Sequence, residues 1–345
     1  MSNTGKLLVS PSPHIHSGDS IERNMYDVII ALLPAWAVSI YYFGLDSVWV
    51  TLTSIVACLL FEWVISRFLL GRKELTIFDG SAILTGLLLA MNLPSTLPLW
   101  IVVIGALVAI GIGKMSFGGL GNNIFNPAIV GRVMLLISFP VQMTSYPTPD
   151  KGLITESVTD ATTAATAALD ATSGATPLAI AKGISRGANG FTMDKLPDML
   201  DNALGNVGGS LGEVSAIALL IGFIYLLIRR VISWHIPVSI IATVAVFAGL
   251  MHLANPALYA GTLFHVLSGG LLLGAIFMAT DYVTSPMSKS GMLVYGVLIG
   301  LITMLIRLFG SYPEGMSFAI LFMNGIVPII NRYMRPHLFG KAKKS

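Results

Sequence analysis

The sequence predicts an all-α integral membrane protein of about ten transmembrane helices, arranged as two inverted five-helix repeats. Of its 345 residues, 54% are hydrophobic and only 11% are charged. Soluble domains carry about 25% charged residues, so this much apolar surface needs a bilayer as its solvent. In addition, the chain alternates short polar segments with apolar runs, most of them near the roughly 20 residues that cross a membrane.

The apolar runs form two groups of five. The first group runs from about 25 to 43, 48 to 70, 81 to 93, 99 to 112 and 128 to 143. The second runs from about 214 to 228, 236 to 254, 263 to 280, 292 to 308 and 316 to 330. We therefore expect five regions: an N-terminal segment 1–24, a first repeat 25–143, an intervening segment 144–212, a second repeat 213–332 and a basic tail 333–345.

The two groups also share short glycine patterns. Residues 105–119 resemble 296–311, and residues 80–86 resemble 268–274. Because five spans is an odd number, a second copy must enter the membrane from the opposite side. Inverted repeats of this kind often place a ligand site at their interface.

Basic residues in the short loops indicate the orientation. Lys and Arg follow the even-numbered spans, at positions 72–73, 114, 229–230, 289 and 332–344. Such an excess marks the cytoplasmic side. Both termini are then expected in the cytoplasm and residues 144–212 outside it. Residues 1–24 lack the apolar core of a signal peptide, so the internal spans are expected to direct insertion of the chain into the membrane.

Composition excludes several function classes. A net charge of +3 does not suggest a nucleic-acid partner. The lone Cys58 cannot supply the four thiolates of a usual iron–sulfur cluster. No pair of histidines has the helical spacing of a metal site, so we expect no metal site. We also expect no catalytic residue in this chain.

The intervening segment is too polar to span a bilayer and long for a simple connection. Within it, Gly174 lets the backbone approach a bulky group, while Pro177 has a fixed φ. Thr176 is thereby displayed between a permissive and a rigid residue, which suits an acceptor hydroxyl for a phosphoryl group. By these residues alone, a linker is the more natural interpretation.

The motif Ser173-Gly-Ala-Thr176 resembles the flavinylation motif of a membrane protein family. That family comprises the D subunit of the Rnf ion-translocating electron-transfer complex and the B subunit of the sodium-pumping NADH:quinone reductase. Residues 118–128, 234–237 and 281–285 resemble further signatures of the family, with Tyr282 where proline is usual. The resemblance covers nearly the whole chain.

This resemblance implies a function and a set of cofactors. Thr176 would carry FMN through a phosphoester, attached by a flavin transferase on the outer side of a bacterial inner membrane, and a non-covalent riboflavin would lie within the membrane. The protein would pass electrons together with the A, B, C, E and G subunits of an Rnf complex, surrounded by lipid, that couples ferredoxin:NAD oxidoreduction to Na⁺ or H⁺ movement. The ferredoxin and nicotinamide sites would belong to those partners.

The segment 118–128 interrupts the helical pattern at or near membrane depth. Irregular backbone there must be buried in protein or line a cavity. Asn123 and Asn126 could contact the edge of a flavin, and Arg132 could meet a phosphate or a carboxylate. The alternative is a purely structural loop, capped by its own asparagines.

Three acidic residues lie within or beside apolar spans. Glu62 is a candidate for an ion pathway, with a structural pair to Arg67 as the alternative. Asp79 is expected to cap the following helix. Asp281 follows its span, so capping does not account for it.

Two other functions stay open. The quinone reductase protein would keep the flavin, although its expected long N-terminal extension does not stand in this sequence. A channel or permease without redox chemistry would also use an inverted repeat. The sequence does not reveal the coupling ion.

Overall fold

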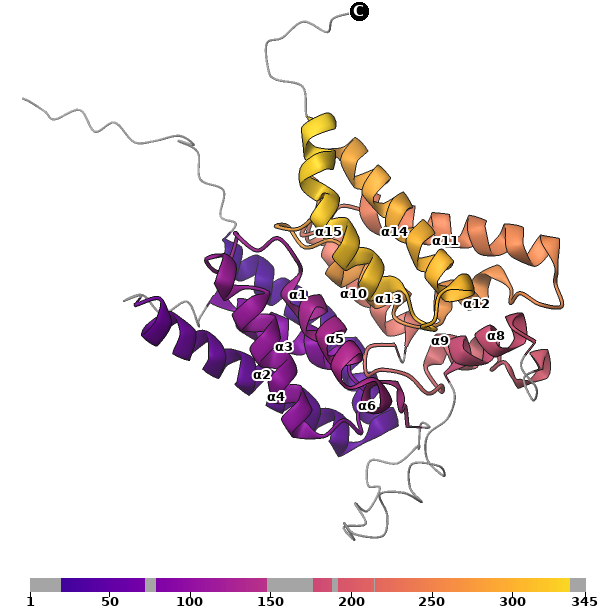
Figure 1. Ribbon diagram of the computed structural model, residues 1–345, viewed down its shortest axis with the longest axis horizontal. Coiled ribbons are helices and arrows are strands. Elements are labelled where there is room, and N and C mark those ends of the chain that lie inside the picture. Colours follow the sequence, from indigo (N-terminus) through magenta and orange to yellow (C-terminus); the bar gives the residue numbers. More distant parts are fainter. Residues whose placement is uncertain (1–19, 72–78, 148–175, 188–191, 214, 336–345) are drawn as a thin grey trace, which may run out of the picture.

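The computed structural model describes residues 20–71, 79–147, 176–187, 192–213 and 215–335, and every regular element in them is a helix. Figure 1 shows two groups of helices side by side, α1 to α6 in indigo to magenta and α10 to α15 in orange to yellow. We call these the first half and the second half. The prediction of an all-α membrane protein is confirmed.

The first half contains five main helices and one short one. These are α1 Ile21–Phe43, α2 Leu45–Val64, α3 Ser81–Met91, α4 Leu99–Leu107, α5 Pro127–Ser138 and α6 Pro140–Thr144. A π-helical turn extends α2 through Ile65–Leu69, and another extends α4 through Val108–Ile112, after which a 3₁₀ turn covers Met115–Phe117. Gly44, at φ 65°, makes the sharp turn between α1 and α2 that a residue with a Cβ rarely adopts.

The second half repeats this order. Its helices are α10 Ala216–Ile228, α11 His235–Ala254, α12 Thr262–Leu267, α13 Leu271–Leu273 with a π-helical turn Gly274–Met278, α14 Lys289–Phe309 and α15 Met316–Tyr333. Between the halves lie α8 Pro177–Ser185, a 3₁₀ turn Met193–Lys195 and α9 Met199–Leu204.

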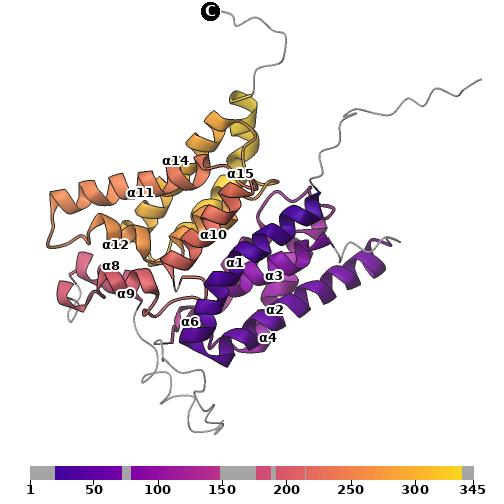
Figure 2. The same ribbon diagram turned by 180° about the vertical axis from the view of Figure 1, so that it is seen from behind.

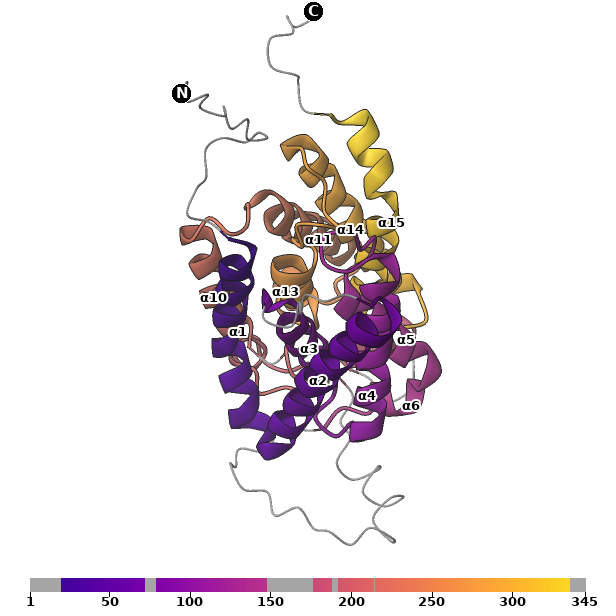
Figure 3. The same cartoon turned by 90° about the vertical axis from the view of Figure 1, so that its left-hand side faces the viewer.

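The first helices of the two halves pack against each other in opposite directions. Asp27, near the start of α1, pairs with Arg229 just after α10, at 2.9 Å. Gly222 lets the backbones approach, because a Cβ there would clash with the carbonyl oxygen of Ala31. Figures 2 and 3 show α1 and α10 side by side. This antiparallel contact is what an inverted repeat requires of its two first helices.

Six helices are long and apolar enough to cross a membrane. They cover residues 21–43, 45–69, 99–117, 235–254, 289–309 and 316–333. Shorter apolar helices cover 81–91, 127–138 and 216–228. With the broken segment 262–278, these helices occupy the ten positions that the sequence predicts, and the chain is a multi-pass membrane protein.

Three predicted boundaries differ from the structure. The fifth predicted span is broken after Ser138, because Pro140 cannot continue a helix. The eighth is interrupted between α12 and α13, where Gly269 has a φ of 73°. The described part of the intervening segment contains α8 and α9, where the sequence predicted a loop.

Two ends of the helix bundle can be distinguished. The start of α1 and the end of α15 lie at the same end, which we call the terminal end (Figures 1 and 3). The opposite end, where α6 finishes and Tyr146 and Thr176 lie, we call the loop end.

Candidate functional site

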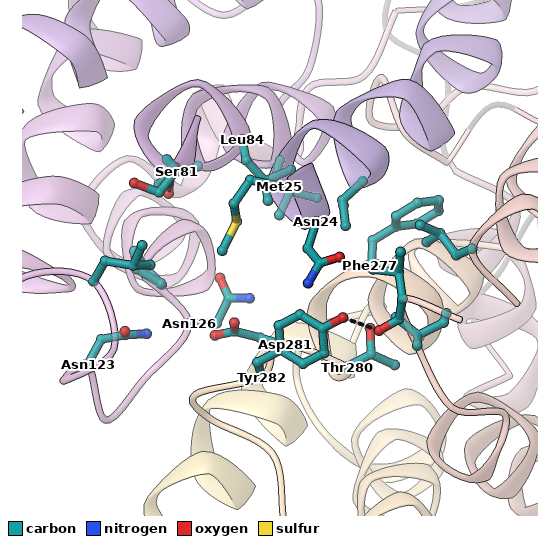
Figure 4. Close-up of a pocket in the computed structure, with 18 of the residues that line it drawn as sticks. Asn24, Met25, Ser81, Leu84, Asn123, Asn126, Phe277, Thr280, Asp281 and Tyr282 are labelled. Carbon is teal, nitrogen blue, oxygen red and sulfur yellow. Dashed lines mark hydrogen bonds between the residues drawn. The ribbon is translucent and has the colours of Figure 1, made fainter. Parts of the chain in front are cut away.

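A cavity of about 80 Å³ lies between the two halves at the terminal end. Both halves line it, because its walls come from α1, α3 and the irregular segment before α5 on one side, and from the end of α10 and residues 276–282 on the other. Figure 4 shows the polar side chains around this space, including Asn24, Ser81, Asn126 and Asp281. We call it the terminal-end cavity.

Glycines shape the irregular segment that forms one wall. Gly118, Gly119 and Gly121 all have φ between 91° and 109°, a conformation that favours glycine. The segment ends at Asn126, whose side-chain oxygen accepts the N–H groups of Ala128 and Ile129 at 3.1 and 3.4 Å. Asn126 is therefore the N-cap of α5.

The same asparagine also joins the halves. Its Nδ2 donates to the carbonyl of Met278 in the second half at 3.2 Å. Asn123 donates to the carbonyl of Phe125 at 3.1 Å, and both asparagines line the terminal-end cavity. Asn126 thus has the structural capping role that the alternative expected, and both asparagines also line the cavity. Contact with a flavin stays a prediction.

Glu62 belongs to a buried polar chain beside this cavity. Lys114, itself a lining residue, donates to Glu62 Oε2 at 2.7 Å and to Ser81 Oγ at 2.6 Å. Arg67, proposed from the sequence as the partner of Glu62, is exposed, so that pairing is wrong. Lys114 lies 52 residues after Glu62, a distance at which sequence spacing carries no signal. A role for Glu62 in ion transport stays a prediction.

The aspartates beside the spans behave differently. Asp79 accepts the backbone N–H of Ser81, the first residue of α3, at 2.9 Å, although the N-cap position itself is Gly80. Asp281 lines the terminal-end cavity and accepts from the hydroxyl of Thr284 at 3.1 Å. Next to it, Tyr282 donates to the carbonyl of Val231 and closes one side of the cavity (Figure 4). Sequence reasoning singled out Asp281 without a role and missed the position of Tyr282.

Thr176 lies at the loop end, as the N-cap of α8. Its Oγ accepts the N–H of Ala179 at 3.2 Å, and Pro177 occupies the first helical position, where its missing N–H costs nothing. Lys182 anchors the helix by donating to the carbonyls of Ile306 and Tyr312. Burial, with a smaller contribution from Arg186, lowers the pKa of Lys182 to about 8. Ser173, the other predicted residue of this motif, lies outside the described residues.

Arg132 does not line the terminal-end cavity. It points toward the loop end, where it donates to Asn92 Oδ1 at 2.5 Å and lies 3.6 Å from Glu213. It therefore meets a carboxylate, one of the two groups considered for it. The structure brings Asn123 and Asn126 together at the terminal end. Thr176 lies at the loop end, and Arg132 pairs with Glu213 there.

Two oppositely directed halves with broken helices and a cavity at their interface define the inverted-repeat class of membrane proteins, many of which have a ligand site at that interface. Within that class, the sequence profile of the NQR2, RnfD, RnfE family matches residues 8–340. The chain therefore belongs to this family.

Individual relatives agree with this assignment. The chain is 42% identical to the D subunit of the ion-translocating oxidoreductase complex of Stutzerimonas stutzeri, over 93% of each chain. It is also 42% identical to the D subunit of the Na⁺-translocating ferredoxin:NAD⁺ oxidoreductase complex of Acetobacterium woodii, over 99% of this chain and 98% of the relative. The proton-translocating counterpart of Clostridium ljungdahlii is 38% identical over 97% and 96%.

Proposed function

We propose that this chain is the D subunit of an Rnf-type complex of a bacterial inner membrane, which couples electron transfer between ferredoxin and NAD to movement of Na⁺ or H⁺. The relatives named above, similar over nearly their whole length, support this proposal. The protein would work with partners, the A, B, C, E and G subunits of the Rnf complex, because the donor and acceptor sites lie elsewhere.

The observation that carries the cofactor assignment is the position of Thr176. Thr176 is the N-cap of the nine-residue helix α8, and it lines a small cavity at the loop end. A helix N-terminus presents free N–H groups and a partial positive charge, which favour a phosphate. The residues present therefore fit a threonyl phosphoester of FMN, and a bound flavin would supply reversible acceptance of one or two electrons.

The terminal-end cavity is the proposed site of the non-covalent riboflavin. Apolar walls from both halves and the edges of Asn123, Asn126 and Asp281 suit a flat, partly polar ring system. The protein's own residues would orient the ring and exclude water. Because Asn126 already caps α5, its part is to hold the wall in place.

Mutation of the acceptor hydroxyl tests the covalent flavin. Thr176→Ala removes the only atom at that position able to form the ester, so we expect no flavin fluorescence from the denatured chain and no FMN adduct in the intact mass. Thr172→Ala is the matched control and keeps the adduct. The host must supply a flavin transferase. An adduct that persists in Thr176→Ala places the site elsewhere.

Two further outcomes address the other functions. A native chain without any adduct, in a host with a competent transferase, would favour a permease. Identification of the copurifying proteins separates an Rnf complex from the quinone reductase.

Accessibility of an engineered cysteine at position 160 to an impermeant reagent tests whether the intervening segment faces outward.

A further inference from the structure

A second, smaller cavity lies at the loop end, with a volume of about 20 Å³. Its lining includes Thr176, Asn202, Glu213, Ser268 and Glu314. We call it the loop-end cavity. About 10–15 Å³ suffices for one water-sized species, so this space admits a small ion and is too small for a flavin ring.

Several buried polar atoms around this cavity have no hydrogen-bond partner within the described part of the chain. They are Oε1 of Glu213, which has only an ion pair with Arg132 at 3.6 Å, both polar atoms of the Asn202 side chain and Oγ of Ser268. Asn202 and Ser268 are each only 2% exposed. A buried polar atom without a partner destabilises the folded chain, so such atoms are rare. Because all three residues line one cavity, a single cation there would contact an oxygen of each, whereas the Asn202 Nδ2 is a donor that a cation does not satisfy.

The charges around the cavity are arranged with the carboxylates inward. Arg132 lies 3.6 Å from Glu213, and Arg307 lies 3.3 Å from Glu314, but neither arginine lines the cavity. Arg307 donates to Glu314 and also to the carbonyls of His265 and Ser268 at 2.6 and 3.0 Å. Glu314 accepts the backbone N–H groups of Gly270 and Met316 as well, at 3.0 and 3.1 Å.

Two arginines and two glutamates cancel formally, so no net charge of the cluster repels a cation. The face turned to the cavity carries carboxylate, amide and hydroxyl oxygens, the ligands that hard cations prefer. This chemistry distinguishes the loop-end cavity from an anion site.

We propose that the loop-end cavity binds one monovalent cation, a proton or a sodium ion, between Glu213 and Glu314. Burial first, and then the neighbouring Glu314, raise the pKa of the Glu213 carboxyl above its ordinary value, which favours a bound proton or a substitute cation. Three charged or titratable groups interact with the pair: Arg132 on α5 with Glu213, Arg307 on α14 with Glu314, and Tyr146 after α6 with both glutamates. Lys182 on α8 and His265 on α12 contact carbonyl groups or Arg307 and neither glutamate.

The cation site would respond to the flavin, and this part rests on the proposed function. Thr176 lines the same cavity, so a phosphoester there would add a negative charge beside the site. That charge offsets the one that the cation brings. The cation is therefore expected to bind more tightly to the flavinylated chain than to Thr176→Ala.

Equilibrium binding of radioactive sodium to the purified full-length chain tests the proposal, with potassium as the competitor. We expect one saturable sodium site in the native chain. Glu213→Gln abolishes it, and Asn202→Ala, which keeps all four charges, weakens it about tenfold by removing one ligand. Glu22→Gln, the same change at an exposed position, leaves binding unchanged.

A proton would give a different result in the same samples. Sodium would then not bind, but infrared spectra would show a protonated carboxyl at neutral pH that disappears in Glu213→Gln. If the native chain shows neither sodium binding nor this band, the cavity holds water only and the proposal is wrong. Flavin fluorescence of the denatured samples is read separately, so loss of the flavin with binding retained would contradict the proposed function and not the cation site.

Discussion

The two ends of the interface between the halves differ in size and in charge. The terminal-end cavity is about 80 Å³, and most of its lining is apolar, with amide, hydroxyl and carboxyl groups at one edge. The loop-end cavity is about 20 Å³ and is framed by two arginine–glutamate pairs. The larger cavity has the mostly apolar lining that is typical of sites for organic ligands, whereas the smaller one has carboxylates turned inward, which suits an ion. One inverted architecture thus contains two chemically distinct cavities.

Breaking a buried pair at the loop end is expected to have the largest effect. Arg307 is 2% exposed, and Arg307→Leu would leave Glu314 with a buried, uncompensated charge. We expect a loss of about 3–5 kcal/mol in the free energy of unfolding. Thermal unfolding in detergent measures it.

The matched control is Arg186→Leu, at an exposed arginine that donates one hydrogen bond to the carbonyl of Gly310. It should cost no more than about 1.5 kcal/mol. Equal effects of the two substitutions would mean that burial of the pair is unimportant.

The contact between the halves can be disturbed away from either cavity. Gly222→Ala places a Cβ against the backbone of Ala31, which forces α1 and α10 apart at a cost of about 1–3 kcal/mol. Gly111→Ala is the control, because a Cβ there meets only side-chain carbons at ordinary distance. If both ends share one interface, Gly222→Ala should also weaken riboflavin retention and sodium binding. Preserved binding at both ends would show that the sites are independent of this contact.

At the terminal end, Asn126→Ala removes a helix cap and a bond between the halves. We expect a loss of about 1–2 kcal/mol in the free energy of unfolding, together with weaker retention of non-covalent flavin. Asn255→Ala removes a comparable bond to the N–H of Ala257 at an exposed position and should have little effect. Unchanged flavin content in Asn126→Ala would argue against the proposed riboflavin site.

The smallest expected effect is a pH dependence at the loop end. The folded-state pKa of Glu213 is raised above its ordinary value of 4.5, so the folded chain holds this proton more tightly than the unfolded chain. The stability that this tighter proton binding gives the folded chain is fully present below pH 4.5. It is lost as the pH rises through the folded-state pKa of Glu213. Unfolding temperature should therefore decline over that window in the native chain, and this decline should be absent in Glu213→Gln. An identical pH profile for the two chains would place the titrating group elsewhere.

The sequence by itself determined the membrane class, the ten apolar segments and the start of α5. These depend on local properties: apolar runs of sufficient length, and an Asn-Pro pair that caps a helix and begins it. It also singled out Thr176, Asn123 and Asn126 as candidate site residues, although for Thr176 it predicted a loop where α8 begins.

Only the tertiary structure decided which charges meet. Glu62 pairs with Lys114 rather than with Arg67 in the next turn, and Arg132 donates to Asn92 rather than lining the cavity of Asn123 and Asn126. Glu213 and Glu314 stand 101 positions apart in the chain and line one cavity. The packing of the helices decides which buried charges pair, because a charge removed from water is stable only next to an opposite charge. That choice is a property of the assembled halves, and no local pattern records it.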